Sequence, residues 1–330
     1  MRAGRLIEVL EKLLEASRWA AFIWGAPGTG KSSIVREAAA KRKLPVVDLR
    51  ASLLDPTDLR GLPMVKDGRA LWCPPAFLPT PEMKPGVLFL DEINAAPPLV
   101  QAAMYQLVLD RRVGEYELPA GWRILAAGNR ASDRAVTFRL SSALANRFIH
   151  LTLEPDIASW SEWAFSHRVR PEVIGLLRYR SELLYTKPEE GAAFATPRSW
   201  EMASDALKAF GGIREARDVL PGIVGEGPAA ELAAFAGNAA IAREIEALLK
   251  DPEGAPISKQ LDHLWALVTH LASGAGDSKQ GTAAIEALLF RLPAEFAVVL
   301  ARDTLKVSPK FMLKPAFRRF MKENASLFKS

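Results

Sequence analysis

The chain has 330 residues, 49% of them hydrophobic and 25% charged, which is the composition of an ordinary globular protein with two domains or three small ones. Its one cysteine, Cys73, excludes an internal disulfide, and no apolar stretch reaches the roughly 18 residues of a membrane-spanning helix, so we expect a cytoplasmic protein without a membrane span. The net charge of +5 permits contact with an acidic partner such as nucleic acid but does not demand it.

The first half of the chain alternates predicted helices and strands. Residues 1–8 place charges among the first apolar side chains, which indicates an amphipathic helix and not a signal peptide. Short apolar runs that end at glycines or acids indicate buried strands, and the segments between them have helical spacing. The predicted strands are residues 19–24, 45–49, 87–90, 124–127 and 148–153, and the predicted helices lie near 6–14, 32–40 and 98–108. This alternation predicts an α/β fold with a parallel five-stranded sheet covered on both faces.

Two predicted hairpins interrupt this alternation, and a helical region follows it. Short apolar runs flank the Asp67-Gly68 turn, which favours a hairpin, and a weaker signal lies around Gly114. After about residue 155 the strand pattern stops, and breaks rich in glycine and proline divide the remainder into groups of helices. We therefore expect three parts, over residues 1–155, 156–250 and 251–330.

The segment after the first predicted strand carries a phosphate-binding motif. It matches G-x-x-x-x-G-K-[ST] in full and precedes a predicted helix. Glycines let backbone N–H groups point at phosphate oxygens, and the following helix offers its positive N-terminal end to the same charge. We expect Lys31 to reach the β- and γ-phosphates of ATP, and Ser32 to ligate Mg²⁺. The expected nucleotide-binding residues are Gly25, Ala26, Pro27, Gly28, Thr29, Gly30, Lys31, Ser32 and Ser33.

Two adjacent acids, Asp91 and Glu92, follow the third predicted strand. Ligands bind at the carboxyl edge of open α/β sheets, so we expect Asp91 to hold Mg²⁺ and Glu92 to polarise the water that attacks the γ-phosphate. Alone, such a pair is often only a helix start, but the phosphate-binding motif earlier in the chain favours the catalytic interpretation. Asn129 follows the fourth predicted strand, where it would either orient the attacking water or cap a turn.

With these motifs in this order, the chain resembles an AAA+ ATPase of the MoxR-like group over roughly residues 5–210. The resemblance implies an αβα ATPase domain and a helical lid, assembled as a homo-hexameric ring with ATP between subunits. Asn129 matches the sensor-1 position of that family. Arg147, in an Asn-Arg-Phe run, matches the arginine finger that reaches a neighbour's ATP, and Arg198, in a Thr-Pro-Arg run, matches the sensor-2 arginine of the lid. Without the resemblance, both arginines would be interpreted as surface ion-pair partners.

The resemblance also implies a partner. The two predicted hairpins of this chain resemble inserts of that family, which would face the pore of the ring or the partner surface. MoxR-like ATPases frequently work with a protein that carries a von Willebrand factor A domain. This chain departs from the pattern at Arg130, where many members have proline. Arg130, Arg134 and Arg139 are candidates for a second contact in trans.

The expected function is ATP hydrolysis that drives chaperone-like remodelling or activation of a protein partner. Two alternatives stay open: a motor that acts on nucleic acid, and a slow ATP-dependent switch or scaffold. The ordered motifs disfavour a small-molecule kinase. The nucleic-acid alternative depends on a C-terminal basic run with interleaved phenylalanines: Lys306, Lys310, Phe311, Lys314, Phe317, Arg318, Arg319, Phe320 and Lys322.

Overall fold

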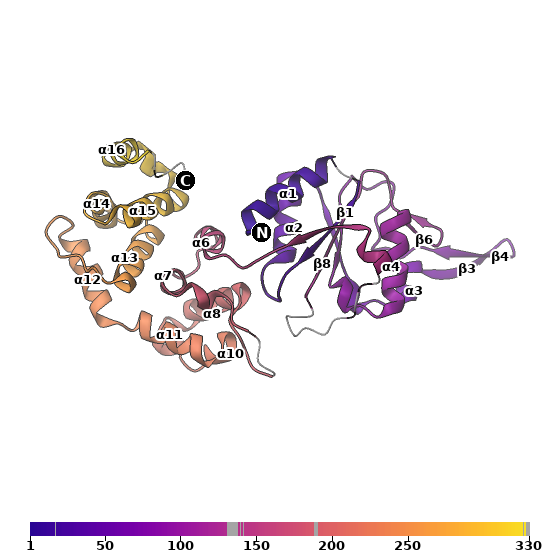
Figure 1. The fold of residues 1–330 in the computed structure, drawn as a ribbon, viewed down its shortest axis with the longest axis horizontal. Coiled ribbons are helices and arrows are strands. Elements are labelled where there is room, and N and C mark those ends of the chain that lie inside the picture. Colours follow the sequence, from indigo (N-terminus) through magenta and orange to yellow (C-terminus); the bar gives the residue numbers. More distant parts are fainter. Residues whose placement is uncertain are drawn as a thin grey trace. The chain divides into compact units, whose positions relative to one another are not determined.

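A computed structural model describes residues 1–16, 18–130, 138, 140, 142–187, 191–325 and 327, without the side chain of residue 143. The chain divides into two compact units, an N-terminal unit over Met1–Pro155 and a C-terminal unit over Asp156–Ser330 (Figure 1). None of the described helices has the length and hydrophobicity needed to span a lipid bilayer.

The N-terminal unit is built around a parallel sheet of five strands in the order β2-β5-β8-β1-β9. Its elements in chain order are α1 Ala3–Ala16, β1 Ala20–Trp24, α2 Lys31–Lys41, β2 Val46–Arg50, η1 Ala51–Leu53, α3 Pro56–Arg60, β3 Leu62–Lys66, β4 Arg69–Cys73, β5 Val87–Asp91, η2 Ile93–Ala95, α4 Pro98–Asp110, β6 Arg112–Val113, β7 Tyr116–Glu117, β8 Arg123–Gly128, α5 Ser142–Ala145 and β9 Phe148–Thr152. The predicted fold class and all five predicted sheet strands are confirmed.

Both faces of this sheet are buried, which explains the continuous apolar runs of its strands. Successive side chains point to opposite faces. On β1, Ala21 and Ile23 therefore pack in one core with α1 and α2, whereas Ala20 and Phe22 pack in another with α4. The result is a layer of helix on each side of the sheet, with the carboxyl ends of the five strands at one edge.

Both predicted hairpins are present in the N-terminal unit. β3 pairs antiparallel with β4 through the Asp67-Gly68 turn, where both residues have positive φ, as a tight hairpin of this type requires. β6 pairs with β7 around Gly114. The β3–β4 hairpin extends away from the sheet (Figure 1), and Arg60 at its base lies 4.0 Å from the ring centre of Trp72 and 3.7 Å from the carboxylate of Glu115.

The described part of the C-terminal unit is helical, and one hydrophobic cluster runs from Trp160 to Phe320. Its elements are α6 Ile157–Ser166, α7 Pro171–Tyr179, η4 Ser181–Leu184, α8 Pro197–Phe210, α9 Ile213–Ala216, α10 Pro221–Val224, α11 Glu226–Ala236, α12 Ala239–Lys250, α13 Leu261–Ser273, α14 Lys279–Leu288, α15 Ala294–Val307, η5 Pro309–Leu313 and α16 Pro315–Glu323. The division of this unit near residue 250 stays a prediction.

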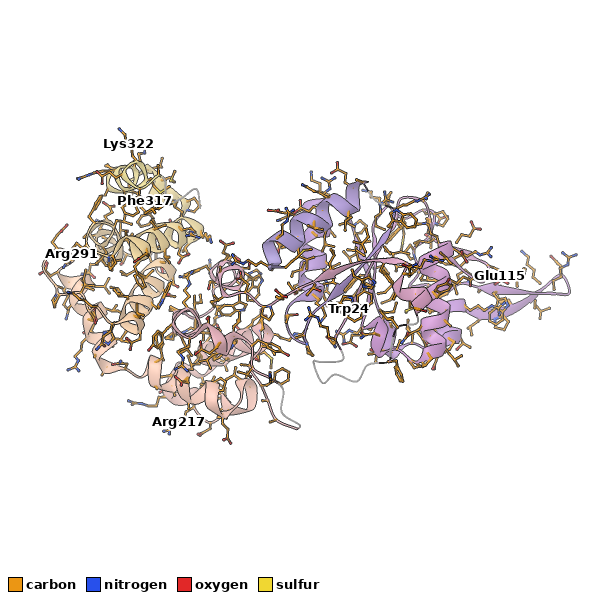
Figure 2. All side chains as sticks on the ribbon, in the orientation of Figure 1. Trp24, Glu115, Arg217, Arg291, Phe317 and Lys322 are labelled. Carbon is orange, nitrogen blue, oxygen red and sulfur yellow. The ribbon has the colours of Figure 1, made fainter. Side chains whose placement is uncertain are left out.

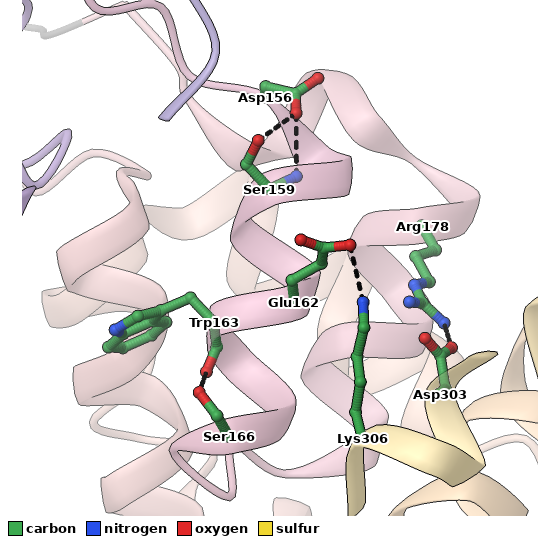
Figure 3. A network of polar contacts seen from close by, with 8 residues as sticks. All are labelled: Asp156, Ser159, Glu162, Trp163, Ser166, Arg178, Asp303 and Lys306. Carbon is green, nitrogen blue, oxygen red and sulfur yellow. Dashed lines mark hydrogen bonds and ion pairs between the residues drawn. The ribbon is translucent and has the colours of Figure 1, made fainter. Parts of the chain in front are cut away.

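A buried ion pair joins distant helices of the C-terminal unit. Arg178 on α7 donates to the carboxylate of Asp303 on α15, whose side chain is only 2% exposed (Figure 3). The same guanidinium lies 5.0 Å from the ring centre of Phe165 and 5.6 Å from that of Trp265. Arg178 of α7 therefore contacts side chains of three other elements, α6, α13 and α15, at once. Nearby, Lys306 of α15 pairs with Glu162 of α6 at 2.7 Å.

Replacing Arg178 with leucine leaves the Asp303 carboxylate buried without its partner. We expect the free energy of unfolding of the C-terminal unit to fall by about 3–5 kcal/mol, because an uncompensated buried charge is strongly destabilising. Urea denaturation followed by circular dichroism measures the loss. The control is Arg180→Leu, which removes an arginine whose pairs with Glu182 and Glu231 are exposed to solvent and should change stability within the error of measurement. Equal losses in the two variants would contradict this account.

Candidate functional site

The phosphate-binding motif forms a loop between β1 and α2. Its two positive-φ glycines, Gly28 and Gly30, occupy the left-handed region that side chains disfavour, and Gly30 is the residue immediately before α2. The N–H of Gly25 donates to the carbonyl of Gly128 at 3.3 Å, which fixes the start of the loop to the end of β8. The loop therefore ends with backbone N–H groups and the positive end of α2 together, an arrangement suited to anions.

Lys31, the first residue of α2, connects this loop to Asn129. Its Nζ donates to the carbonyls of Gly25 and Ala26, at 2.7 and 3.0 Å, and to Oδ1 of Asn129 at 2.8 Å. The side chain is largely buried, so these charge-assisted bonds compensate for its lost hydration. The structure thus brings together two residues predicted from separate motifs, 98 positions apart in the chain.

Ser32 and Asp91 also meet at the carboxyl edge of the sheet. The hydroxyl of Ser32 donates to Oδ2 of Asp91 at 2.6 Å, and the other carboxylate oxygen accepts from the backbone N–H of Glu92 at 2.9 Å. The described residues contain no cluster of three or more His, Cys, Asp or Glu side chains suited to a metal. A pair of one hydroxyl and one carboxylate instead fits Mg²⁺, which usually keeps several waters and takes few protein ligands.

Glu92 has an unusual backbone and a hydrogen-bond partner that we did not predict from the sequence. Its φ of 56° and ψ of 32° lie in the left-handed region, which costs energy for a residue with a side chain and is found most often at functional sites. Its Oε2 accepts from the hydroxyl of Ser52 at 2.6 Å. Ser52 lies in η1, directly after β2, which neighbours β5 in the sheet. The carboxylate of Glu92 is therefore held beside the neighbouring strand end.

Asn94 is a second site residue that sequence reasoning missed. Its side chain is buried, and its Nδ2 donates to the backbone carbonyl of Asn129 at 2.6 Å. Its Oδ1 lies 2.2 Å from the position that a Cβ on Gly128 would occupy, so any side chain at Gly128 would require Asn94 to shift. Among the described residues, that buried Oδ1 has no hydrogen-bond partner. Asn94 thus fixes the backbone at the point where Asn129 leaves β8.

The predicted arginines fall in different places. Arg147 follows α5 in the N-terminal unit and is half-buried; its Nε is buried and has no hydrogen-bond partner among the described residues. Arg198 is the second residue of α8 in the C-terminal unit, whose first turn is closed by a capping box of Thr196 and Ser199. The roles of both arginines toward a nucleotide stay predictions. Arg130 is described, whereas Arg134 and Arg139 lie outside the described residues.

Comparison with protein families agrees with this geometry. Residues 20–148 match the AAA domain of the dynein-related subfamily. This match covers less than half of the chain. The matched range begins with β1 and ends at the first residue of β9, so it contains four of the five sheet strands and, except for Arg198, every predicted site residue. The assignment of the chain to the MoxR-like group stays a prediction. No curated protein sequence matches the chain.

Several solved structures show a remote likeness. NtrX from Brucella abortus is 16% identical over 72% of this chain and 51% of its own, with a TM-score of 0.35, so our chain spans about half of its length. An ATPase described from Cytophaga hutchinsonii is 17% identical over 67% of this chain and 80% of its own, with a TM-score of 0.36. RuvB from Thermotoga maritima, a Holliday junction branch migration motor, is 17% identical over 86% of both chains, with a TM-score of 0.36. Likeness at this level does not indicate what our chain acts on.

Replacing Gly128 with alanine tests the packing behind the site. The added methyl group would overlap Oδ1 of Asn94 and Cζ of Phe22, which lie 2.2 and 2.8 Å from its position. We expect the free energy of unfolding to fall by about 1–3 kcal/mol, as for other overpacked core positions. The matched control is Gly4→Ala in α1, where no atom lies within 4 Å and alanine favours the helix. Thermal unfolding of both variants measures the difference, and an unchanged Gly128→Ala protein would contradict the described contact.

Proposed function

We propose that the N-terminal unit binds ATP with Mg²⁺ and hydrolyses it. This proposal is based on two hydrogen bonds beside the phosphate-binding loop. One joins Lys31 to Asn129, and the other joins Ser32 to Asp91. The match of residues 20–148 to an AAA domain supports it independently. Ser32 and Asp91 would hold Mg²⁺, and the bound ion would offset the charge that develops on the phosphate oxygens.

Each remaining side chain has a role that follows from its place. The loop N–H groups and the start of α2 would bind the phosphates, and the ammonium of Lys31, which already bonds the loop carbonyls, would add positive charge beside them. Glu92 would polarise the attacking water, with its carboxylate held by Ser52. Asn129 would orient that water, because its backbone is fixed by Asn94.

We propose further that the protein acts as a ring, with Arg147 supplied to the nucleotide of a neighbouring subunit and Arg198 acting on the nucleotide of its own. An arginine supplied in trans can accelerate phosphoryl transfer by roughly 10³–10⁵. The buried Nε of Arg147 without a partner among the described residues supports this, because such a donor is costly unless something binds it. A homo-hexamer is the assembly proposed.

The partner proposed is a protein, and a von Willebrand factor A domain protein is one candidate. The β3–β4 hairpin supports a protein surface, since Leu62 is 74% and Val65 82% exposed on a ribbon that extends from the sheet. The features that pointed to nucleic acid are weaker in the structure. Phe311, Phe317 and Phe320 are buried in the helical core and not available for stacking with bases. Lys314 and Arg319 each pair with a glutamate.

Glu92→Gln tests the catalytic base. The amide keeps the size of the side chain but cannot accept a proton, so we expect ATP affinity within about twofold of wild type and turnover lower by at least about 100-fold. Phosphate release measures turnover, and a fluorescent ATP analogue measures affinity. A matched control is Glu82→Gln, which changes an exposed acid between β4 and β5 in the same unit. Normal turnover in Glu92→Gln would contradict the assignment.

Mixing variants tests the role of Arg147 in trans. Arg147→Ala should bind ATP yet lose hydrolysis, and Lys31→Ala should lose binding yet keep its arginine. Each variant should be inactive alone, while a mixture should regain activity where the intact site of one faces the intact arginine of the other. Phosphate release from mixtures at a constant total protein concentration measures this. Mixtures that exchange subunits and remain inactive would contradict the proposal.

A further inference from the structure

Trp24 and His150 form a polar contact that the proposed mechanism does not yet use. Trp24 is the last residue of β1, directly before the phosphate-binding loop, and it is labelled in Figure 2. Its Nε1 donates to Nδ1 of His150 on β9 at 2.8 Å, with the two rings nearly parallel at 15° and their centres 6.0 Å apart. Nε2 of His150 lies 2.8 Å from the carbonyl oxygen of Ala145, the last residue of α5.

The hydrogen-bonding capacities of the Trp24 indole and the Ala145 carbonyl indicate which nitrogen of the His150 imidazole carries the proton. The indole N–H of Trp24 can only donate, so Nδ1 of His150 accepts and carries no proton. The carbonyl of Ala145 can only accept, so Nε2 carries the proton and donates. A neutral His150 therefore satisfies both neighbours, and each of its nitrogens has a defined partner in a different element of the fold.

Arg147 lies in the chain between Ala145 and His150, the two residues that this hydrogen bond joins. The bond from His150 to Ala145 spans five residues and closes a short loop that contains Arg147, whose own N–H donates to the carbonyl of Leu144 at 3.1 Å. β9 pairs with β1 in the sheet, and Phe148 packs against Phe22 with ring centres 5.4 Å apart. The arginine segment is thus fixed to β1 twice, by the sheet and by the Trp24–His150 contact.

We propose that His150, held by Trp24, is a positioning residue that fixes the Arg147 segment to the strand leading into the phosphate-binding loop, so that the arginine is presented to a neighbouring subunit in a defined place. His150 is exposed, and hydrogen bonds open to water add little to folding stability, so its main contribution is to geometry. Misplacement of a catalytic group by about 1 Å can cost roughly 100-fold in rate. The inference rests on the proposed trans role of Arg147.

The test compares His150→Ala with three variants. His150→Ala removes both hydrogen bonds and should lower kcat about tenfold while leaving KM for ATP within about twofold, because the site of the subunit itself is intact. Trp24→Phe keeps an aromatic ring but removes the donor, and it should show a smaller loss of the same kind. His150→Gln supplies one acceptor and one donor and should restore most of the lost kcat. The control is His167→Ala, which removes a histidine stacked on Trp163 at 4.3 Å in the C-terminal unit.

Mixing experiments separate a positioning role from a structural one. If His150→Ala misplaces Arg147, mixing it with Lys31→Ala should restore hydrolysis, because Lys31→Ala keeps an intact arginine segment. Mixing it with Arg147→Ala should not restore hydrolysis. If Arg147→Ala complements His150→Ala and Lys31→Ala does not, the inference is overturned. The Trp24–His150 contact would then support the phosphate-binding loop of its own subunit and not the arginine. An unchanged kcat, or a loss that His150→Gln does not restore, would also overturn it.

The two proposals can fail separately. If Arg147→Ala and Lys31→Ala do not complement each other, the trans role of Arg147 fails, and the inference about His150 fails with it. If that pair does complement but His150→Ala behaves as wild type, only the inference about His150 is overturned.

Discussion

The order of strands in the sheet is the constraint on which the candidate site depends. β8 lies between β5 and β1, so the parallel register sets Trp24 beside Gly128 and brings the end of β5 to the same edge. The residues that follow these strand ends therefore lie at the same carboxyl edge of the sheet: the phosphate-binding loop after β1, Glu92 after β5 and Asn129 after β8. The hydrogen bond between Lys31 and Asn129 is a direct consequence, since it crosses from the loop to the neighbouring strand end.

Small residues and backbone strain complete the site around that edge. Gly128 leaves room for Asn94, and Asn94 holds the backbone from which the Asn129 side chain projects. Glu92 keeps a left-handed backbone that the surrounding contacts must maintain, among them the hydrogen bond from Ser52. Costs of this kind are expected where a catalytic group must be held in one geometry before the substrate arrives.

Local patterns in the sequence were sufficient for much of this account. The five strands were predicted because each is a short apolar run, and the phosphate loop because its glycines, lysine and serine have a fixed spacing. Contacts across strands could not be predicted in the same way. Ser52 meets Glu92 only because Arg50 is in register with Asp91, and the Trp24–His150 contact requires that β1 and β9 be neighbours. A signal did exist for Ser52, which lies just beyond the end of a predicted strand.

We propose that Lys31 and the residues around it form a binding site for ATP. Isothermal titration of the full chain with ATP in the presence of Mg²⁺ tests this most directly, with Lys31→Ala measured beside the wild type. We expect saturable binding of one ATP per chain by the wild type and affinity at least about tenfold lower in Lys31→Ala, because the variant loses a charge-assisted contact with phosphate. Absence of binding by the wild type, or equal affinity in both proteins, would contradict it.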